Sequence, residues 1–145
     1  MKQWTALLFA TMAIHAAAKQ LLVYSIVSAG LFISSFAYHT SDKTSAYGRI
    51  WFWIDQACIY AMAMVAFYYM YYTKQSVTQV GLLTALLVFL LYWGGWATDS
   101  CCFDDNATDA VFSHCSMHVI GAIGHHCVIA GIEDSVPIIN AVAAP

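Results

Sequence analysis

The sequence predicts an all-α protein, a polytopic bundle of four to five transmembrane helices. Of its 145 residues, 61% are hydrophobic, 15% are aromatic and only 9% are charged. A water-soluble chain of this size carries roughly a quarter charged residues, so the surface of this chain is too poor in charge to stay solvated. Segments in which apolar and polar residues alternate, as in the strands of a membrane β-barrel, are absent from the sequence. We therefore expect a multi-pass integral membrane protein, and the sequence does not say which membrane holds it.

The spans can be read from the gaps between charged residues, because a helix needs about 20 residues to cross ~30 Å of hydrocarbon. Four such stretches cover residues 21–40, 50–72, 80–98 and 110–132. Short polar segments join them, as expected for connections between neighbouring helices. We expect one membrane domain over residues 1–145.

The first 18 residues fit two interpretations. Lys2, the apolar run 5–14 and the three alanines 16–18 resemble the zones of a secretory signal. The same residues could instead form a short first span. We favour the retained span, because a helix that begins at Leu21 would pack against it.

Polar groups inside a membrane are costly, so each needs a partner or a function. Within the four expected spans, Asp55 is the one charged residue. Five of the six histidines lie in or at the ends of these spans, namely His39, His114, His118, His125 and His126. These side chains are the candidates for chemistry.

The order of the spans predicts that four of the candidates meet. His114 and His118 are four residues apart, so they project from one helix face and can share a metal ion. His39 ends one span, Asp55 follows the start of the next, and two crossings bring the chain back before His114. We therefore expect all four side chains at similar depth on one membrane face.

Three imidazoles beside a carboxylate suit zinc, which in one type of catalytic site takes three histidines and keeps a fourth position for water. Asp55 would then orient or deprotonate that water. A single membrane histidine is more often an interhelical hydrogen-bonding residue, so the prediction depends on the constellation. Ser35 precedes His39 by one turn, but a serine in a membrane helix usually bonds to its own turn.

Three motifs resemble the CREST superfamily of membrane hydrolases, which includes alkaline ceramidases, the adiponectin and progestin receptors, and the myomaker and GPI-remodelling branch. Ser35–His39 (SFAYH) is similar to the S-x3-H motif that ends the family's second span. His114–His118 (HCSMH) is similar to the H-x3-H motif that opens its last span. The spacing from His39 to Asp42 and Asp55 is similar to that of the myomaker branch.

The resemblance implies a Zn²⁺ ion held by His39, His114 and His118, a water activated by Asp55, and Ser35 supporting the site or the oxyanion. Its active members cleave lipid amides or esters, so a membrane lipid is the implied substrate and ceramidase-like hydrolysis the implied reaction. The family has seven spans, whereas this chain has four or five. The chain would therefore be a shortened member that lacks two central helices.

Two other functions stay open. His39 with His118 or His125 on facing helices could ligate haem in a membrane electron carrier. The fold could also serve a non-catalytic fusion or scaffold protein with zinc as a structural ion. Nucleic acid is an unfavourable partner, because the net charge of −3 gives no basic field for phosphates. The sequence leaves homo-oligomerisation and the orientation of the site open.

Overall fold

The computed structural model describes residues 2–132 of the chain, and this part is an all-α bundle without a β-strand. The prediction of an all-α helical bundle is therefore confirmed. An isolated antiparallel bridge joins Thr73 to Ile132. Within residues 2–132, three stretches of helix are long and apolar enough to cross a membrane, namely Leu22–Thr40, Ala46–Met70 and Gln75–Thr98.

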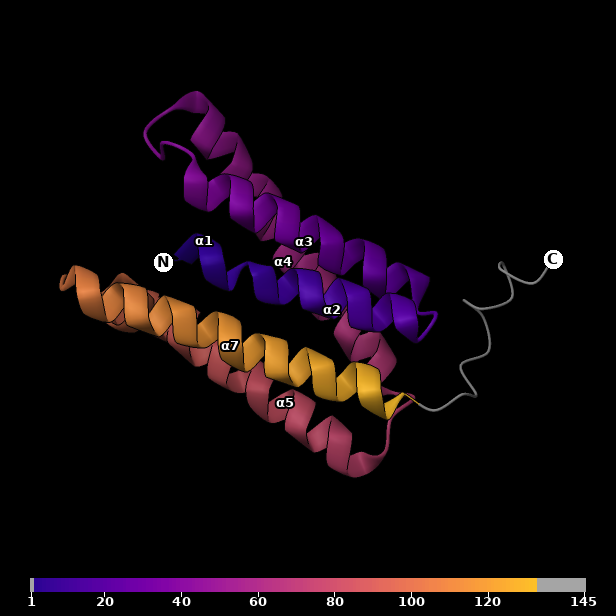
Figure 1. The fold of residues 1–145 in the computed structure, drawn as a ribbon. Helices are drawn as coiled ribbons and strands as arrows, with labels where there is room; N and C mark the ends of the chain where they lie inside the picture. Colours follow the sequence, from indigo (N-terminus) through magenta and orange to yellow (C-terminus); the bar gives the residue numbers. More distant parts are fainter. Residues whose placement is uncertain (1, 133–145) are drawn as a thin grey trace.

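The first half of the bundle consists of helices that run back and forth beside one another (Figure 1). They are α1 (Lys2–Thr5), α2 (Leu7–Ala18), α3 (Leu22–Thr40) and α4 (Ala46–Met70). The turn between α2 and α3 depends on Gln20, which takes a left-handed φ of 59°. The amide of Gln20 donates to the carbonyl of Ala17, and the amide of Leu21 donates to that of Ala16, each over 2.9 Å. This pair of bonds is the Schellman pattern that ends helices.

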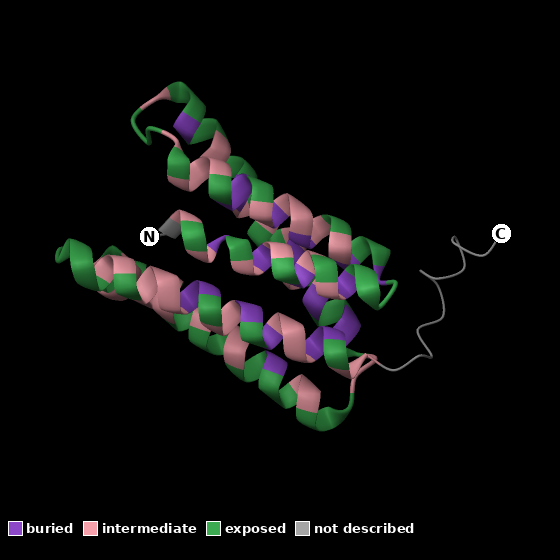
Figure 2. Ribbon diagram, viewed as in Figure 1, coloured by how far each residue is buried: buried purple, intermediate pink, exposed green. Residues whose placement is uncertain are grey.

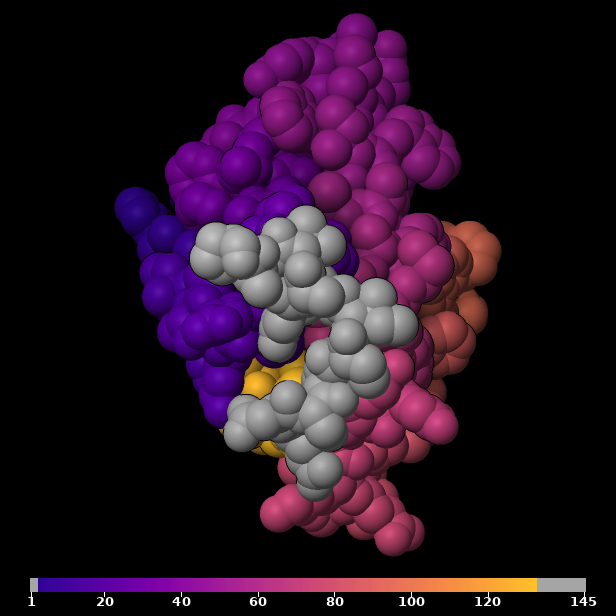
Figure 3. Space-filling model, turned by 90° about the vertical axis from the view of Figure 1, so that its right-hand side faces the viewer, coloured from indigo at the N-terminus to yellow at the C-terminus, as the bar shows by residue number. Residues whose placement is uncertain are grey.

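The second half begins with α5 (Gln75–Phe89) and continues through the π-helical turn η1 (Leu90–Gly94) into α6 (Gly95–Thr98). A short 3₁₀ turn, η2 (Cys101–Phe103), leads into α7 (Ala107–Gly131). Figure 1 shows α5 and α7 side by side along the lower edge of the bundle. The space-filling view from the right-hand end of Figure 1 places α5 on the side opposite α3 (Figure 3).

Helices α4, α5 and α7 begin three to five residues before the apolar stretches that predicted them, whereas α3 begins one residue after its stretch. Helix α4 begins at Ala46 because the Ser45 hydroxyl accepts a 3.0 Å hydrogen bond from the amide of Gly48. Helix α7 begins at Ala107 because the side chain of Asn106 caps it through the amide of Thr108. A search for apolar residues misses these polar first turns.

Helix α7 differs from the expected fourth span in one respect. It is 25 residues long, which is enough to cross a membrane, but it is not among the three stretches that are also apolar enough. Four histidines and several small polar residues lower its hydropathy. Its position inside the bundle accounts for this composition, because it packs on α1, α2 and α5.

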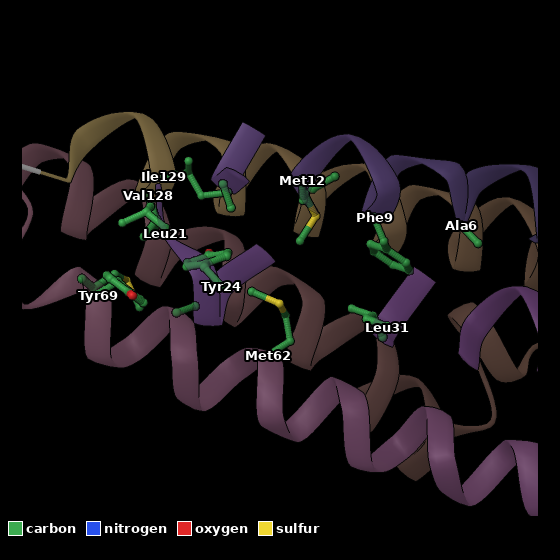
Figure 4. Close-up of a cluster of buried hydrophobic side chains, with 14 residues drawn as sticks. Ala6, Phe9, Met12, Leu21, Tyr24, Leu31, Met62, Tyr69, Val128 and Ile129 are labelled. Carbon is green, nitrogen blue, oxygen red and sulfur yellow. The ribbon is translucent and has the colours of Figure 1, made fainter. Parts of the chain in front are cut away.

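The core lies where α2, α3, α4 and α7 face one another. Figure 4 shows Phe9 and Met12 of α2 close to Leu31 of α3 and Met62 of α4, and all four side chains are buried. The outward faces are apolar as well. Trp53, for example, is 70% exposed, and the exposed residues form the outer surface of the helices in Figure 2. A bundle with apolar side chains on both its inner and outer faces is suited to a bilayer.

Candidate metal centre

Three histidines from the two halves of the chain converge at one end of the bundle. His39 is the penultimate residue of α3, whereas His114 and His118 lie one turn apart on α7. One ring nitrogen from each lies within 4.8 Å of the others. The Nε2 atoms of His39 and His114 are 3.2 Å apart. The structure thus brings together the three histidines that the sequence proposed as ligands.

The three imidazoles could hold a metal ion, and two of their nitrogens have the spacing of neighbouring zinc ligands. Zinc–nitrogen bonds of 2.0–2.1 Å at tetrahedral angles place neighbouring ligand nitrogens about 3.3 Å apart, close to the separation of the two Nε2 atoms. The planes of the His39 and His114 rings are at 89° to each other. The rings are therefore not stacked, and a nitrogen lone pair from each can point at the same ion. Among residues 2–132, this is the one group of at least three ligating side chains.

Thr5 contributes a contact to this centre that the sequence did not predict. Its Oγ1 lies 2.7 Å from Nδ1 of the buried His118. A histidine that binds a metal through one nitrogen usually has its other nitrogen held by a hydrogen bond, which fixes the ring orientation. With Nδ1 held by Thr5, Nε2 is the atom of His118 that suits a metal. Nothing in the sequence distinguishes this threonine, because its neighbours read as a signal or a short span.

Asp55 of α4 is buried, and it accepts a hydrogen bond from Ser34 of α3, the neighbour of the predicted Ser35. Asp55 is 5% exposed, and the Ser34 hydroxyl lies 3.1 Å from its Oδ1. The same hydroxyl lies 3.2 Å from the carbonyl of Leu31, but the carboxylate is the stronger acceptor. Ser35, which the sequence proposed, is also buried. Sequence reasoning missed Ser34 because the family motif includes only the second of the two serines.

A single cavity of about 650 Å³ connects these groups. Its walls include the three histidines, Asp55 and Ser35 at one end of the bundle. Most of the remaining wall is apolar and comes from α4, α5 and α7. The cavity exists because α5 packs along α7 and hardly touches α4. The site is therefore the polar end of a long apolar space.

The loop between α3 and α4 contributes one side chain to the cavity wall. Lys43 lines the cavity, and its Nζ lies 5.0 Å from the centroid of the Tyr38 ring. The next residue back, Asp42, accepts hydrogen bonds from the amide and hydroxyl of Thr44. These bonds hold the pKa of the Asp42 carboxyl below its usual range. The Asp42 side chain is therefore a carboxylate at neutral pH.

The remaining histidines lie away from the three ligands. His126 Nδ1 lies 2.9 Å from His15 Nδ1, and its Nε2 lies 3.0 Å from Thr11 Oγ1. His125 Nδ1 lies 2.7 Å from the hydroxyl of Tyr24. His126 was one of the five candidate histidines, and its contacts place it outside the three-histidine cluster. His125, a candidate haem ligand, is instead joined to α3.

Comparison of the chain with protein-family models, curated proteins and solved structures finds no significant match. The resemblance to the CREST superfamily consequently depends on the three motifs alone, and membership stays a proposal.

Proposed function

We propose that this protein is a multi-pass membrane hydrolase that uses zinc to cleave an amide or ester bond of a lipid. One observation carries the proposal. His39, His114 and His118 lie together at the polar end of a long apolar cavity whose wall also holds Asp55 and Ser35. An amphiphile with its polar bond near the histidines and its chain in the cavity would match this division of polarity.

The three histidines would hold the ion, with His118 using Nε2 because Thr5 contacts its Nδ1. When bound, zinc lowers the pKa of a water molecule toward ~7 and polarises a carbonyl group. Three protein ligands leave a coordination position for that water. The donor set is therefore that of a catalytic site rather than the fully protein-ligated set of a structural one.

Asp55 would accept the proton of the attacking water. The Ser34 hydroxyl donates to Oδ1, so the carboxylate is oriented and Oδ2 is the oxygen that takes the proton. Burial of Asp55 within the bundle excludes most of the competing water. The same proton can then pass to the leaving amine or alkoxide, as general acid–base catalysis requires.

Ser35 would stabilise the oxygen that becomes negatively charged. It lies one helical turn before His39 on α3, so the two side chains project from the same face. Ser35 is buried and lines the cavity, which supports a role for its hydroxyl as a donor to the scissile carbonyl. A single donor in such a position is worth several kcal/mol to a transition state.

The proposal that the bundle lies in a membrane is supported by three stretches of span length and by large exposed apolar side chains. A lipid could then reach the cavity sideways from the bilayer, between α4 and α5, which make few contacts with each other. The motifs similar to those of the CREST superfamily support the same chemistry.

The geometry favours zinc over haem. The His114 ring centroid lies 4.9 Å from that of His39 and 4.6 Å from that of His118. A porphyrin placed between His39 and His118 would overlap the His114 ring. The three imidazoles can all serve one small ion without such a conflict.

The test is hydrolysis by the full chain in nanodiscs. The substrates are ceramides, N-acyl amino acids and lysophospholipids, assayed with the protein as purified, after chelation, and after zinc is restored. We expect turnover that chelation abolishes and zinc recovers. A zinc-loaded protein that hydrolyses none of these lipids would favour the structural-zinc scaffold, and a Soret band would favour the haem carrier.

A further inference from the structure

His125 is a polar side chain in the apolar part of the cavity. It lines the same cavity as the three ligand histidines but lies seven residues beyond His118 on α7. Seven residues are almost two turns and about 10 Å along the helix axis. His125 therefore projects from nearly the same stripe of α7 as His118, about 10 Å farther along the helix.

The tautomer of His125 follows from its contact with Tyr24. The Tyr24 hydroxyl is fully buried and lies 2.7 Å from His125 Nδ1. Burying an O–H group without an acceptor is costly, so we assign Tyr24 as the donor and Nδ1 as the acceptor. A neutral imidazole that accepts at Nδ1 carries its hydrogen at Nε2. The second nitrogen of His125 is thus a hydrogen-bond donor.

If His125 served only to bond α7 to Tyr24 of α3, its second N–H group would not be needed. A hydrogen bond from Tyr24 needs one acceptor, whereas an imidazole brings an additional N–H into an apolar environment, where it is costly unless it too is bonded. Thr84 provides a contrast on the same cavity wall. Its hydroxyl lies 2.9 Å from the carbonyl of Gly81 on its own helix, so it needs no ligand.

The cavity is long enough for a lipid chain to pass His125. On α4 its wall extends from Phe52 to Met70, which is about 27 Å at 1.5 Å per residue. The cavity is therefore nearly as long as the hydrocarbon core of a bilayer is thick, which is ~30 Å. A chain whose reacting carbonyl lies at the histidines would reach His125 near its middle.

We propose that the preferred lipid carries an oxygen atom near the middle of its acyl chain, as a hydroxyl, keto or epoxide group, and that His125 Nε2 donates a hydrogen bond to it. The inference rests on the proposed function, because it assumes that the carbonyl lies beside the three ligand histidines. His125 is then a specificity residue and takes no part in the bond cleavage.

The test measures binding, so it does not depend on turnover. Full-length protein in detergent, with and without zinc, is loaded with a fluorescent fatty acid. The probe is displaced by three fatty acids of equal length, one unsubstituted, one with a hydroxyl near mid-chain, and one with the hydroxyl next to the carboxyl group. We expect the mid-chain acid to bind roughly five- to tenfold more tightly than the other two, the size of one neutral hydrogen bond.

The variant His125→Leu should bind all three acids with equal affinity, whereas His125→Gln, which keeps an N–H donor, should retain part of the preference. The matched control is His126→Leu, because His126 contacts Thr11 and His15 and does not line the cavity. It should leave the preference intact.

Equal affinity of the wild-type protein for the three acids would overturn the proposal, even if His125→Leu fails to fold. A mid-chain preference that persists in His125→Leu would overturn it as well. A protein that keeps the preference but hydrolyses no lipid would support the subsite while contradicting the hydrolase.

Discussion

His39 and His114 place their Nε2 atoms 3.2 Å apart, although 75 residues separate them in the chain. The path between them consists of α4, the α5–α6 helix and their loops, which cross the bundle once in each direction. An even number of crossings returns the chain to the end from which it left, as Figure 1 shows for the end of α3 and the start of α7. The two imidazoles therefore lie close together because the helices between them cross the bundle an even number of times.

We expect the purified full-length protein to hold about one zinc ion per chain, because three imidazoles within 4.8 Å match its ligand number. Elemental analysis after gel filtration measures the ratio. Chelation should also lower the melting temperature, since an ion bound only by the folded state stabilises it. Protein from zinc-replete cells that is folded but free of metal would rule out the site.

The substitution His118→Ala should remove most of the zinc, because it deletes one of three ligands from a buried position. His126→Ala is the matched control on the same helix. Its ring contacts Thr11 and His15 and lies outside the cluster, so zinc should be retained. Equal loss of zinc in both variants would show that α7 is rotated relative to the arrangement described above.

Thr5→Val should weaken zinc binding by about 10- to 100-fold, the usual effect of losing a hydrogen bond to a ligand. Valine keeps the shape of threonine but cannot bond to His118 Nδ1, so the ring loses its orientation. The comparison is Thr11→Val, which removes the corresponding contact from His126 and should leave the affinity unchanged. Zinc affinities come from competition with a chromogenic chelator. Unchanged affinity in Thr5→Val would show that the contact is incidental.

The helical bundle and the meeting of the three histidines could be predicted from the sequence because both depend on simple regularities. Scarce charges mark where apolar helices lie, and the number of crossings brings His39 and His118 to the same end. The contacts of Thr5 and Ser34 could not be predicted in this way. They depend on how α1 packs against α7 and on which of two adjacent serines faces α4, and these are matters of side-chain packing that a hydropathy pattern does not record.

Gly124→Ala should destabilise the protein by about 1–3 kcal/mol, the usual cost of overpacking. A Cβ atom at Gly124 would overlap the side chain of Thr84, because α5 and α7 approach closely there. Gly121→Ala is the control one turn earlier, where the nearest atom to a new Cβ is Val88 Cγ2 at 3.6 Å, an ordinary contact. Thermal unfolding in detergent compares the two. Equal stability would mean that α5 can shift away from α7 at little cost.

Asp55→Asn should leave zinc bound and abolish hydrolysis. The amide has the same shape and can still accept the hydrogen bond from Ser34 through its oxygen, but it cannot take a proton from water. Loss of a general base typically costs about 10² to 10⁴ in rate. Wild type and variant are therefore compared for both zinc content and turnover of the same lipid.

The control for this experiment is Ser34→Ala, which keeps the carboxylate of Asp55 and removes the hydroxyl that orients it. Because the proton acceptor remains, we expect a smaller loss of rate than in Asp55→Asn, with zinc content unchanged in both. If Asp55→Asn turns over lipid as fast as wild type, Asp55 is not the base. If it loses zinc together with activity, the carboxylate acts by supporting the metal rather than by accepting the proton.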